Sequence, residues 1–455
     1  MQKLLTPQKE QDSPFHKHLS KFSCLMIGIG GLIGGGIFSV LGVISVFTGP
    51  YSYISYIITG VIALITVYSY QKLNLKWCSS GGEYICVKNA FIGTRLQNLG
   101  IYIGVLLFFG YITSMALYAY TFSVYFLLLF NIEFNFTLII LIVLILYTIF
   151  TVLNLKGIKE SARFQNYIVL IKIIILVLFI IFGLTYALKN FNQTMINVGF
   201  NQESLGNVNY LGIIIGSSSI IVSYQGFQLI AYGSLEMKDM PGGIKMMKWS
   251  VLISMIIYCL VGFTTMAVLG ISGLLGEGTI NAEVAIARAS LKFMGPFGML
   301  IIIIGCLLST SSALNATILG SSRLAFRMAH DNVFPNFYAK ISKNKVPHNS
   351  IIIISVLSTI LTIITGGALA IAGVAGLIFA QIFFLMNFAN LKVRKQTRSN
   401  AIIPFIGMVL TLSLWILLLI YSIINIKNDF YVLVSFLCIE GASIFFIYYL
   451  NKKNL

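Results

Sequence analysis

Gly28-Ile29-Gly30-Gly31-Leu32-Ile33-Gly34-Gly35-Gly36-Ile37-Phe38 is the stretch of sequence that decides the fold. It lies in an apolar block that is long enough to cross a lipid bilayer. Close packing of helices can use glycines spaced four apart, but it does not require three in a row. Gly34, Gly35 and Gly36 cost a helix roughly 1 kcal/mol per residue relative to alanine and free backbone N–H and C=O groups. Because such groups are tolerated at membrane depth only where they line a cavity or meet a ligand, the stretch predicts a broken transmembrane helix.

The remainder of the chain has the composition of an integral membrane protein. Of its 455 residues, 58% are hydrophobic and only 9% are charged, which leaves too little polar surface to cover a soluble globule. The apolar residues form blocks of about 20, the length of a helix that crosses roughly 30 Å of hydrocarbon. We therefore predict an all-α integral membrane protein with twelve transmembrane helices. The expected spans are residues 22–47, 52–70, 99–130, 136–155, 167–188, 210–235, 249–271, 297–319, 350–365, 368–390, 402–424 and 430–450.

The positions of the 30 basic residues test this count. The ninth and tenth spans form one apolar run, which we divide at Gly366 and Gly367. With the N-terminus inside, 25 Lys and Arg residues fall in inner segments, 4 fall in outer loops, and Lys172 lies within a span. This asymmetry follows the positive-inside rule and predicts a protein of the plasma membrane with both termini in the cytoplasm. It also accounts for the net charge of +17 without a nucleic-acid partner.

The sixth expected span carries a second interruption. Polar side chains and a glycine, Ser223-Tyr224-Gln225-Gly226-Phe227-Gln228, break an otherwise apolar segment at mid-depth. If spans 1–5 and 6–10 are repeats, the two interruptions occupy corresponding positions, which is typical of transporters built on inverted repeats. Half-helix N-termini offer N–H groups to a carboxylate, and half-helix C-termini offer carbonyls to an ammonium. An α-amino acid carries both groups on one carbon.

This pattern divides the chain into four parts. Residues 1–21 form an N-terminal cytoplasmic tail that leads straight into a full-length span, so we expect no cleavable signal peptide. Residues 22–188 form the first inverted repeat with helices 1–5, and residues 210–390 form the second with helices 6–10. Residues 402–450 form the peripheral helices 11 and 12.

Four motifs, in order along the chain, resemble the amino acid–polyamine–organocation (APC) transporters. The resemblance covers most of the chain and is weakest after about Phe388. It implies a LeuT-type fold, with ten core helices in a 5+5 inverted repeat, breaks in helices 1 and 6, and two peripheral helices. The motifs are Ile33-Gly34-Gly35-Gly36-Ile37-Phe38; Gly81-Gly82-Glu83-Tyr84; Ser223-Tyr224-Gln225-Gly226-Phe227 with Glu236 and Pro241; and Leu308-Ser309-Thr310-Ser311-Ser312-Ala313-Leu314-Asn315 with Arg323 and Ala329-His330-Asp331-Asn332-Val333-Phe334-Pro335.

The resemblance also implies a substrate site at the two breaks. The carboxylate would bind the N–H groups of the three glycines, the ammonium would meet carbonyls near Ile33 and at 222–224, and an aromatic residue would act as a gate. Many members carry an acid directly after the position of Phe227, where this chain has Gln228, so we expect no proton-sensing carboxylate there. The candidate substrate-binding residues are Ile33, Gly34, Gly35, Gly36, Ile37, Val222, Ser223, Tyr224, Gln225, Gly226 and Phe227, with Phe227 or Tyr224 as the gate.

Lys172 is the candidate for ion coupling. It lies about nine residues into its span from Arg163, roughly 13 Å along a helix, which is too deep to reach the inner surface. A lysine at this depth should face the bundle interior, and burial favours its neutral form. In the resembling family, a lysine here occupies the region in which sodium-coupled relatives hold their ion, beside hydroxyls at Ser309 and Ser312. We expect Lys172 to carry a proton; a fixed surrogate cation and a structural role are the alternatives.

We therefore interpret the chain as a secondary active transporter, a permease that moves a small zwitterionic amino acid by alternating access with proton coupling through Lys172. The alternatives are an exchanger without ion coupling and a polyamine or amine carrier. The latter should prefer acids in its pocket, and spans 1, 3, 6 and 8 contain none. The third-span face around Leu107, Phe108 and Tyr111 suggests a neutral substrate side chain.

Other chemistry finds little support in the sequence. The six cysteines form no CxxC pair, and the four histidines lie in inner segments, so we expect neither an enzyme nor a metal or cofactor site. Glu440, midway along the twelfth span, is expected to be a protonated or helix-paired structural carboxyl. The expected partners are an amino acid, a proton and membrane lipid, with the chain acting as a monomer or homodimer.

Overall fold

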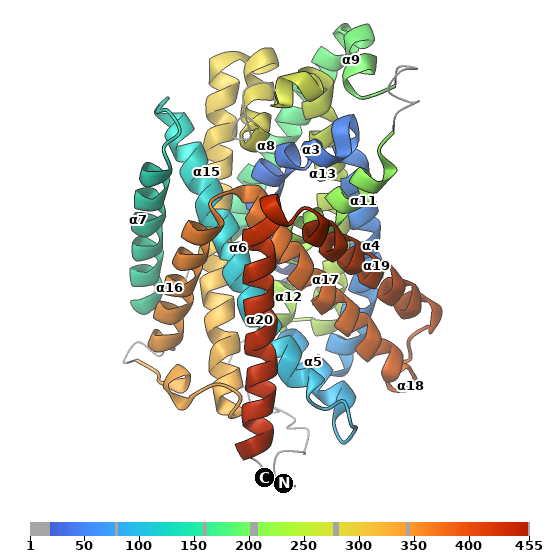
Figure 1. Cartoon of the computed structure of the whole chain (residues 1–455), viewed down its shortest axis with the longest axis vertical. Helices are drawn as coiled ribbons and strands as arrows, with labels where there is room; N and C mark the ends of the chain where they lie inside the picture. The colour runs from blue at the N-terminus through green and yellow to red at the C-terminus, as the bar shows by residue number, and fades with distance from the viewer. Residues whose placement is uncertain are drawn as a thin grey trace.

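The computed structural model describes residues 19–77, 81–157, 162–200, 208–275, 282–342 and 346–453. This part of the chain is helical and has no strand, only an isolated bridge between Leu19 and Met237. The helices form one elongated bundle, in which α3 and α9 lie at one end and α5 and α18 at the other (Figure 1). The helical elements are α1 (Lys21–Leu32), η2 (Gly36–Val40), α2 (Leu41–Val43), α3 (Ser45–Thr48), η3 (Gly49–Tyr51), α4 (Ser52–Lys76), α5 (Gly82–Phe91), α6 (Leu99–Leu129), α7 (Phe136–Leu155), α8 (Ala162–Lys189), α9 (Phe191–Asn197), α11 (Tyr210–Ser219), η4 (Ile220–Tyr224), α12 (Leu229–Tyr232), η5 (Ser234–Glu236), α13 (Met240–Leu275), α15 (Ala285–His330), η6 (Asn336–Ala339), α16 (His348–Thr365), α17 (Ala368–Lys392), α18 (Arg394–Thr397), α19 (Ile402–Ile424) and α20 (Ile426–Lys453).

The expected spans are all found in the described chain. Eleven of its stretches are long and apolar enough to cross a membrane. The first stretch, Lys21–Lys76, contains two of the expected spans, because the chain turns at Gly49, whose φ is 55°. The expected division between the ninth and tenth spans is also present, since α16 ends at Gly366 in the left-handed conformation. Twelve transmembrane helices are therefore consistent with the structure.

Two spans are longer than their apolar cores predict. Helix α13 has 36 residues and α15 has 46, and both continue beyond the apolar segment. Each contains a bend where a glycine leaves helical geometry, at Gly270 with φ 66° and at Gly295 with φ 67°. Pro296 follows the second bend, where proline is tolerated as the first residue of a new helical segment. The extensions are more polar and could not be read from hydropathy.

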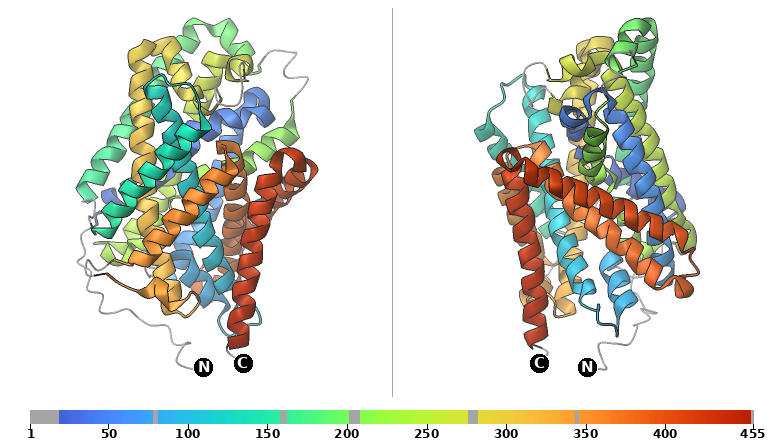
Figure 2. Two further views of the ribbon diagram at one scale, coloured as in Figure 1. Left: turned by 60° about the vertical axis from the view of Figure 1, so that its left-hand side comes forward. Right: turned by 45° about the vertical axis from the view of Figure 1, so that its right-hand side comes forward.

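The outer helices carry apolar side chains on the surface. On α7, Leu141, Ile145 and Ile149 are each about half exposed, as the lipid-facing side of a membrane helix requires. Inside the bundle, α4 packs along α13 and α6 packs along α15. Helices α19 and α20 lie on the outside and contact α17 (Figure 2). Helices α19 and α20 therefore lie at the side of the bundle, next to α17.

Basic side chains gather at the end of the bundle that holds α5 and α18. Lys21 pairs with Asp239 at 2.9 Å, and the ammonium of Lys72 donates to the carbonyl of Arg398 at 3.0 Å. Figure 1 shows α5 and α18 at this end. We call it the basic end, and the end with α3 and α9 the opposite end.

Candidate functional site

The first span breaks at the glycine run. Helix α1 ends at Leu32, and Ile33 leaves helical geometry with φ −77° and ψ 81°. The chain resumes at Gly36 as a π-helix, η2. The N–H of Gly34 donates to the carbonyl of Leu32 at 2.9 Å, so one of the three candidate carboxylate-binding amides is used internally in this conformation.

The sixth span breaks at the second interruption. Helix α11 tightens into the 3₁₀ segment η4, after which Gln225 is extended with ψ 144°. Gly226 then has φ 131°, a conformation that side chains disfavour. The side-chain oxygen of Gln228 accepts from the N–H of Gly226 at 2.7 Å. Gln228, at the position where many members of the resembling family carry an acid, therefore binds a backbone N–H at the break with its side-chain amide.

The two breaks touch each other through glycine. A Cβ atom on Gly226 would lie 2.3 Å from the carbonyl carbon of Gly31. A side chain at this position would therefore prevent the two backbones from approaching so closely. A Cβ on Gly36 would lie 2.4 Å from the hydroxyl oxygen of Ser223. The interrupted segments of spans 1 and 6 are thus directly adjacent.

The carbonyls at the end of α1 collect hydrogen-bond donors from other spans. The Nζ of Lys172 lies 3.2 Å from the carbonyl oxygen of Ile33 and 3.4 Å from that of Gly30. The hydroxyl of Ser309 donates to the same Ile33 oxygen at 2.5 Å. Lys172 is 1% exposed, so its amine is held inside the bundle. The hydroxyl of Ser312 instead donates to the Ser309 carbonyl on its own helix, at 3.1 Å.

A tyrosine that the sequence did not single out joins both breaks. The hydroxyl of Tyr258, on α13, lies 2.5 Å from the carbonyl oxygen of Leu32 and 3.2 Å from that of Ser223. Tyr56, on α4, donates to the carbonyl of Gly36 at 3.2 Å. Buried tyrosine hydroxyls need partners, which is the signal that could have drawn attention to both residues.

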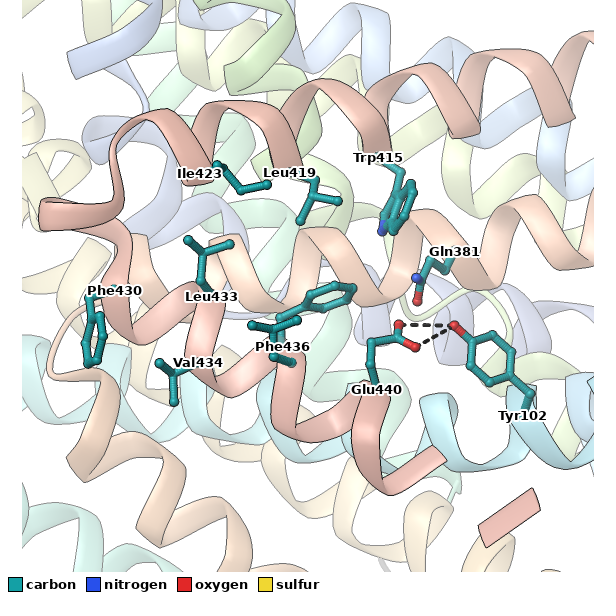
Figure 3. Close-up of a pocket in the computed structure, with 11 residues that line it drawn as sticks. Tyr102, Gln381, Trp415, Leu419, Ile423, Phe430, Leu433, Val434, Phe436 and Glu440 are labelled. Atoms are coloured by element: carbon teal, nitrogen blue, oxygen red, sulfur yellow. Dashed lines mark hydrogen bonds between the residues drawn. The ribbon is translucent and has the colours of Figure 1, made fainter. Parts of the chain in front are cut away.

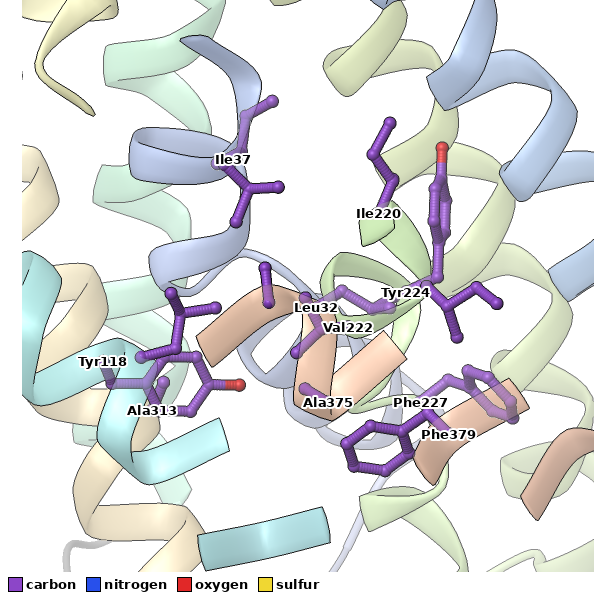
Figure 4. Packing of buried hydrophobic residues seen from close by; sticks show 14 of the residues in the cluster. Leu32, Ile37, Tyr118, Ile220, Val222, Tyr224, Phe227, Ala313, Ala375 and Phe379 are labelled. Carbon is purple, nitrogen blue, oxygen red and sulfur yellow. The ribbon is translucent and has the colours of Figure 1, made fainter. Parts of the chain in front are cut away.

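Apolar and aromatic side chains enclose the breaks. Side chains of spans 1, 3, 6, 8 and 10 point toward one another around this region (Figure 4). The side chains of the candidate substrate-binding residues are almost entirely buried, so protein encloses the breaks in this conformation. The exposed fractions are 0% for Ile33, Ile37, Tyr224 and Phe227, 1% for Ser223, 2% for Val222 and 3% for Gln225.

The third span contacts the breaks through Tyr118, which the sequence did not single out. Tyr118 accepts a hydrogen bond from the side-chain amide of Gln225 at 2.7 Å, and its ring would meet a Cβ on Gly34. Phe108 packs instead against Phe334, close to the last turn of α15. Tyr111 pairs with Tyr232, beyond the break in span 6. Tyr118 lies about two helical turns further from the basic end than Tyr111.

A groove of about 560 Å³ lies outside this region, among α6, α17, α19 and α20 (Figure 3). Its lining is mostly apolar and includes Trp415, Leu419 and Phe436. At one end, Tyr102 donates to Glu440 at 2.8 Å. Glu440 is thus paired to a neighbouring helix, and the groove contains none of the candidate substrate-binding residues. Among the described residues, no three His, Cys, Asp or Glu side chains are grouped so as to hold a metal ion.

Many apolar spans and two touching helix breaks define a multi-pass membrane transport protein. The profile of the amino acid permease family matches residues 19–439, and the chain belongs to this family. The chain is 30% identical to an uncharacterized protein of Methanocaldococcus jannaschii over 95% of both chains. It is 27% identical to a methylthioribose transporter of Bacillus subtilis over 82% of this chain and 78% of the relative. A branched-chain amino acid permease of the same organism is 24% identical over 73% and 71%. The chain is a transporter rather than an enzyme.

Proposed function

We propose that this permease is a secondary active transporter that moves a small zwitterionic amino acid by alternating access, coupled to protons through Lys172. The observation that carries the proposal is the meeting of Lys172 and Ser309 at the carbonyl of Ile33, where span 1 breaks. The basic end faces the cytoplasm of a plasma-membrane protein, with both termini on that side.

Lys172 links a proton to the position of a half-helix. As an ammonium it donates to two carbonyls at the C-terminal end of α1, where the helix dipole favours positive charge. Without its proton, the amine loses this charge-assisted interaction, which weakens the attachment of α1 to α8. Binding and loss of the proton therefore favour different positions of α1.

The chemistry of the breaks favours a neutral amino acid. Ile37, Val222 and Phe227 supply apolar walls, while the backbone supplies N–H and C=O groups. At the family's acidic position, Gln228 is neutral. A polyamine carrier would need carboxylates to balance its substrate, so this alternative is less well supported. The branched-chain amino acid permease among the relatives supports the same substrate class.

The packing also supports two repeats, residues 22–188 and 210–390, with 402–450 peripheral. Helix α4, the second span, lies along α13, the seventh, and α6, the third span, lies along α15, the eighth. These partners hold equivalent places in two five-helix repeats. Inverted repeats that rock about a shared site provide alternating access.

The experiment is uptake of labelled neutral amino acids into sodium-free proteoliposomes, with and without an inward proton gradient. We expect accumulation to require the gradient. Lys172→Ala should abolish this accumulation, whereas Lys189→Ala, at the end of the same helix, should preserve it.

Each alternative has its own result. Uptake only into vesicles preloaded with amino acids, with no response to the gradient, would mean an exchanger in which Lys172 is a fixed charge. Unchanged gradient-driven uptake by Lys172→Ala at all pH values would overturn its role. No amino acid uptake under either condition would favour amines or polyamines.

A further inference from the structure

A carboxyl is buried at the basic end, in a segment outside the membrane spans. Helix α5 lies between the second and third spans, and its Glu83 is 1% exposed. The preceding residue, Gly82, has φ 49°, and a Cβ there would lie 2.8 Å from the ring of Tyr232. Helix α5 is therefore fitted closely against the end of span 6 that follows the break.

Hydrogen bonds lead from this carboxyl to the break itself. The hydroxyl of Tyr232 donates to Glu83 at 3.0 Å and lies 2.8 Å from the hydroxyl of Tyr111. The side-chain amide of Gln228 approaches Tyr111 and also donates to Gln225 at 3.3 Å. A change at Glu83 is thus connected through side chains to the extended residue at which span 6 breaks.

We propose that Glu83 is a proton-binding latch whose neutral form keeps the inner end of the transporter closed and whose ionised form favours opening. The inference rests on the cytoplasmic position of the basic end and on the alternating access proposed above. Its ligand is a proton taken from, and returned to, water at the inner end. It does not require Lys172 to be the coupling site.

Burial is the physical reason that Glu83 binds a proton near neutral pH. Removal from water raises the pKa of the Glu83 carboxyl from its ordinary value of 4.5 to about 7 in the closed conformation. When α5 and α12 separate, water reaches the carboxyl and the pKa returns toward its ordinary value. The closed state therefore binds the proton more tightly than the open state. Low pH favours closure, and rising pH favours opening until the pKa of about 7 is passed.

The groups around Glu83 do not remove this effect. Tyr70 from α4, Tyr111 from α6 and Tyr232 from α12 face the carboxyl, and hydroxyl and backbone hydrogen bonds lower its pKa less than burial raises it. Along α5, Lys88 pairs with Asp331 of α15 at 2.6 Å. On α17, which also packs on α5, the charged residue is Lys392 at the C-terminal end. No Lys or Arg in the described chain forms an ion pair with Glu83.

Cys86 supplies a native reporter of inner-end opening. It lies one turn after Glu83 on α5 and is 0% exposed, so a water-soluble thiol reagent reaches it only when this end opens. The full-length protein in lipid nanodiscs is treated with such a reagent at pH 6, 7 and 8. Modification of the Cys86 peptide is measured by mass spectrometry, and its rate is divided by that of free cysteine at the same pH.

For the wild-type chain we expect the normalised rate to rise about tenfold between pH 6 and pH 8. This rise follows from a Glu83 pKa of about 7 in the closed state and 4.5 in the open state. Glu83→Gln should remove this rise, because its amide stays neutral and still accepts from Tyr232. Glu440→Gln, which neutralises another tyrosine-bound carboxyl, should keep it.

Other results would overturn the latch. A flat wild-type profile would exclude it without any variant, which matters if Glu83→Gln does not fold. A rise that persists in Glu83→Gln, or disappears equally in Glu440→Gln, would also exclude it. Since the readout needs neither a substrate nor a gradient, it separates failure of this inference from failure of the proposed transport activity.

Discussion

Each end of the bundle contains a buried carboxyl that accepts a hydrogen bond from a tyrosine. The two carboxyls differ in the kind of helix to which they are bonded. At the basic end, Glu83 accepts from Tyr232 on the half-helix that follows the break in span 6. At the opposite end, Glu283 lies just before α15 and accepts from Tyr120 at 3.0 Å. Its second oxygen accepts from the N–H of Ala368, the first residue of α17, at 3.1 Å. Glu83 is thus attached to a broken helix, whereas Glu283 is attached to unbroken ones.

The broken helix at the opposite end is held by backbone contact instead. A Cβ on Gly42, in the outer half of span 1, would lie 1.8 Å from the carbonyl oxygen of Ala282, next to Glu283. The corresponding contact at the basic end, between Gly82 and Tyr232, is with a side chain. The comparison indicates that side-chain hydrogen bonds fasten the broken helix at the basic end, whereas a tight backbone fit fastens it at the opposite end.

The largest effect on uptake should come from adding a side chain at the tight backbone contact between Gly42 and Ala282. Gly42→Ala places a methyl group on backbone that cannot move aside, so we expect the opposite end to fail to close and initial uptake to fall at least about a hundredfold. Gly82→Ala is the matched change. It adds strain of roughly 1 kcal/mol at positive φ and meets a ring that can shift, so we expect a loss of about tenfold. Equal losses in the two variants would contradict the proposed difference.

The sequence predicted the spans better than it predicted what holds them together. Helices α7 and α19 begin and end at the expected residues, because hydropathy and bilayer thickness together determine such helices. The breaks were also predictable, since consecutive glycines and clustered polar residues are costly in an apolar span. The contacts of Tyr258, Tyr118 and Glu83 were not, because their hydrogen-bond partners lie on helices distant in sequence.

A smaller effect should come from the carboxyl at the opposite end. Burial raises the pKa of Glu283 to about 7, so its neutral form should favour closure of that end. Val284, which is 5% exposed, can be changed to cysteine as a reporter. We expect labelling of Val284→Cys, normalised to free cysteine, to rise several-fold from pH 6 to pH 8. Added Glu283→Gln should remove this rise without changing the pH response of Cys86.

A rise at Val284→Cys that persists with Glu283→Gln would mean that only the basic end responds to pH through its carboxyl. Loss of the Cys86 response in that variant would mean that the two carboxyls are not independent. Either result would contradict the view that each end of the bundle responds to pH through its own carboxyl.

The smallest effect should come from removing one hydroxyl. Tyr232→Phe keeps the ring beside Gly82 but removes the donor to Glu83. Loss of a hydrogen bond to the ionised form raises the pKa of the carboxyl. We expect the midpoint of the Cys86 labelling profile to move upward by about one pH unit. Tyr120→Phe, the equivalent change at Glu283, should leave this midpoint in place; a shift there instead would contradict the assignment of Tyr232.

The depth of Lys172 has an electrical consequence. It is the eleventh of the 28 residues of α8, roughly 15 Å from one end of the helix and 26 Å from the other. In the proposed orientation, with the basic end in the cytoplasm, a coupling proton that reaches Lys172 from outside would cross more than half of the membrane voltage. Moving one charge across the whole membrane is worth about 2.3 kcal/mol per 100 mV, so an interior that is negative by about 100 mV contributes more than about 1 kcal/mol to this step. For the protonation of Lys172 from outside, a membrane voltage of about 100 mV therefore has the same effect as lowering the external pH by about one unit.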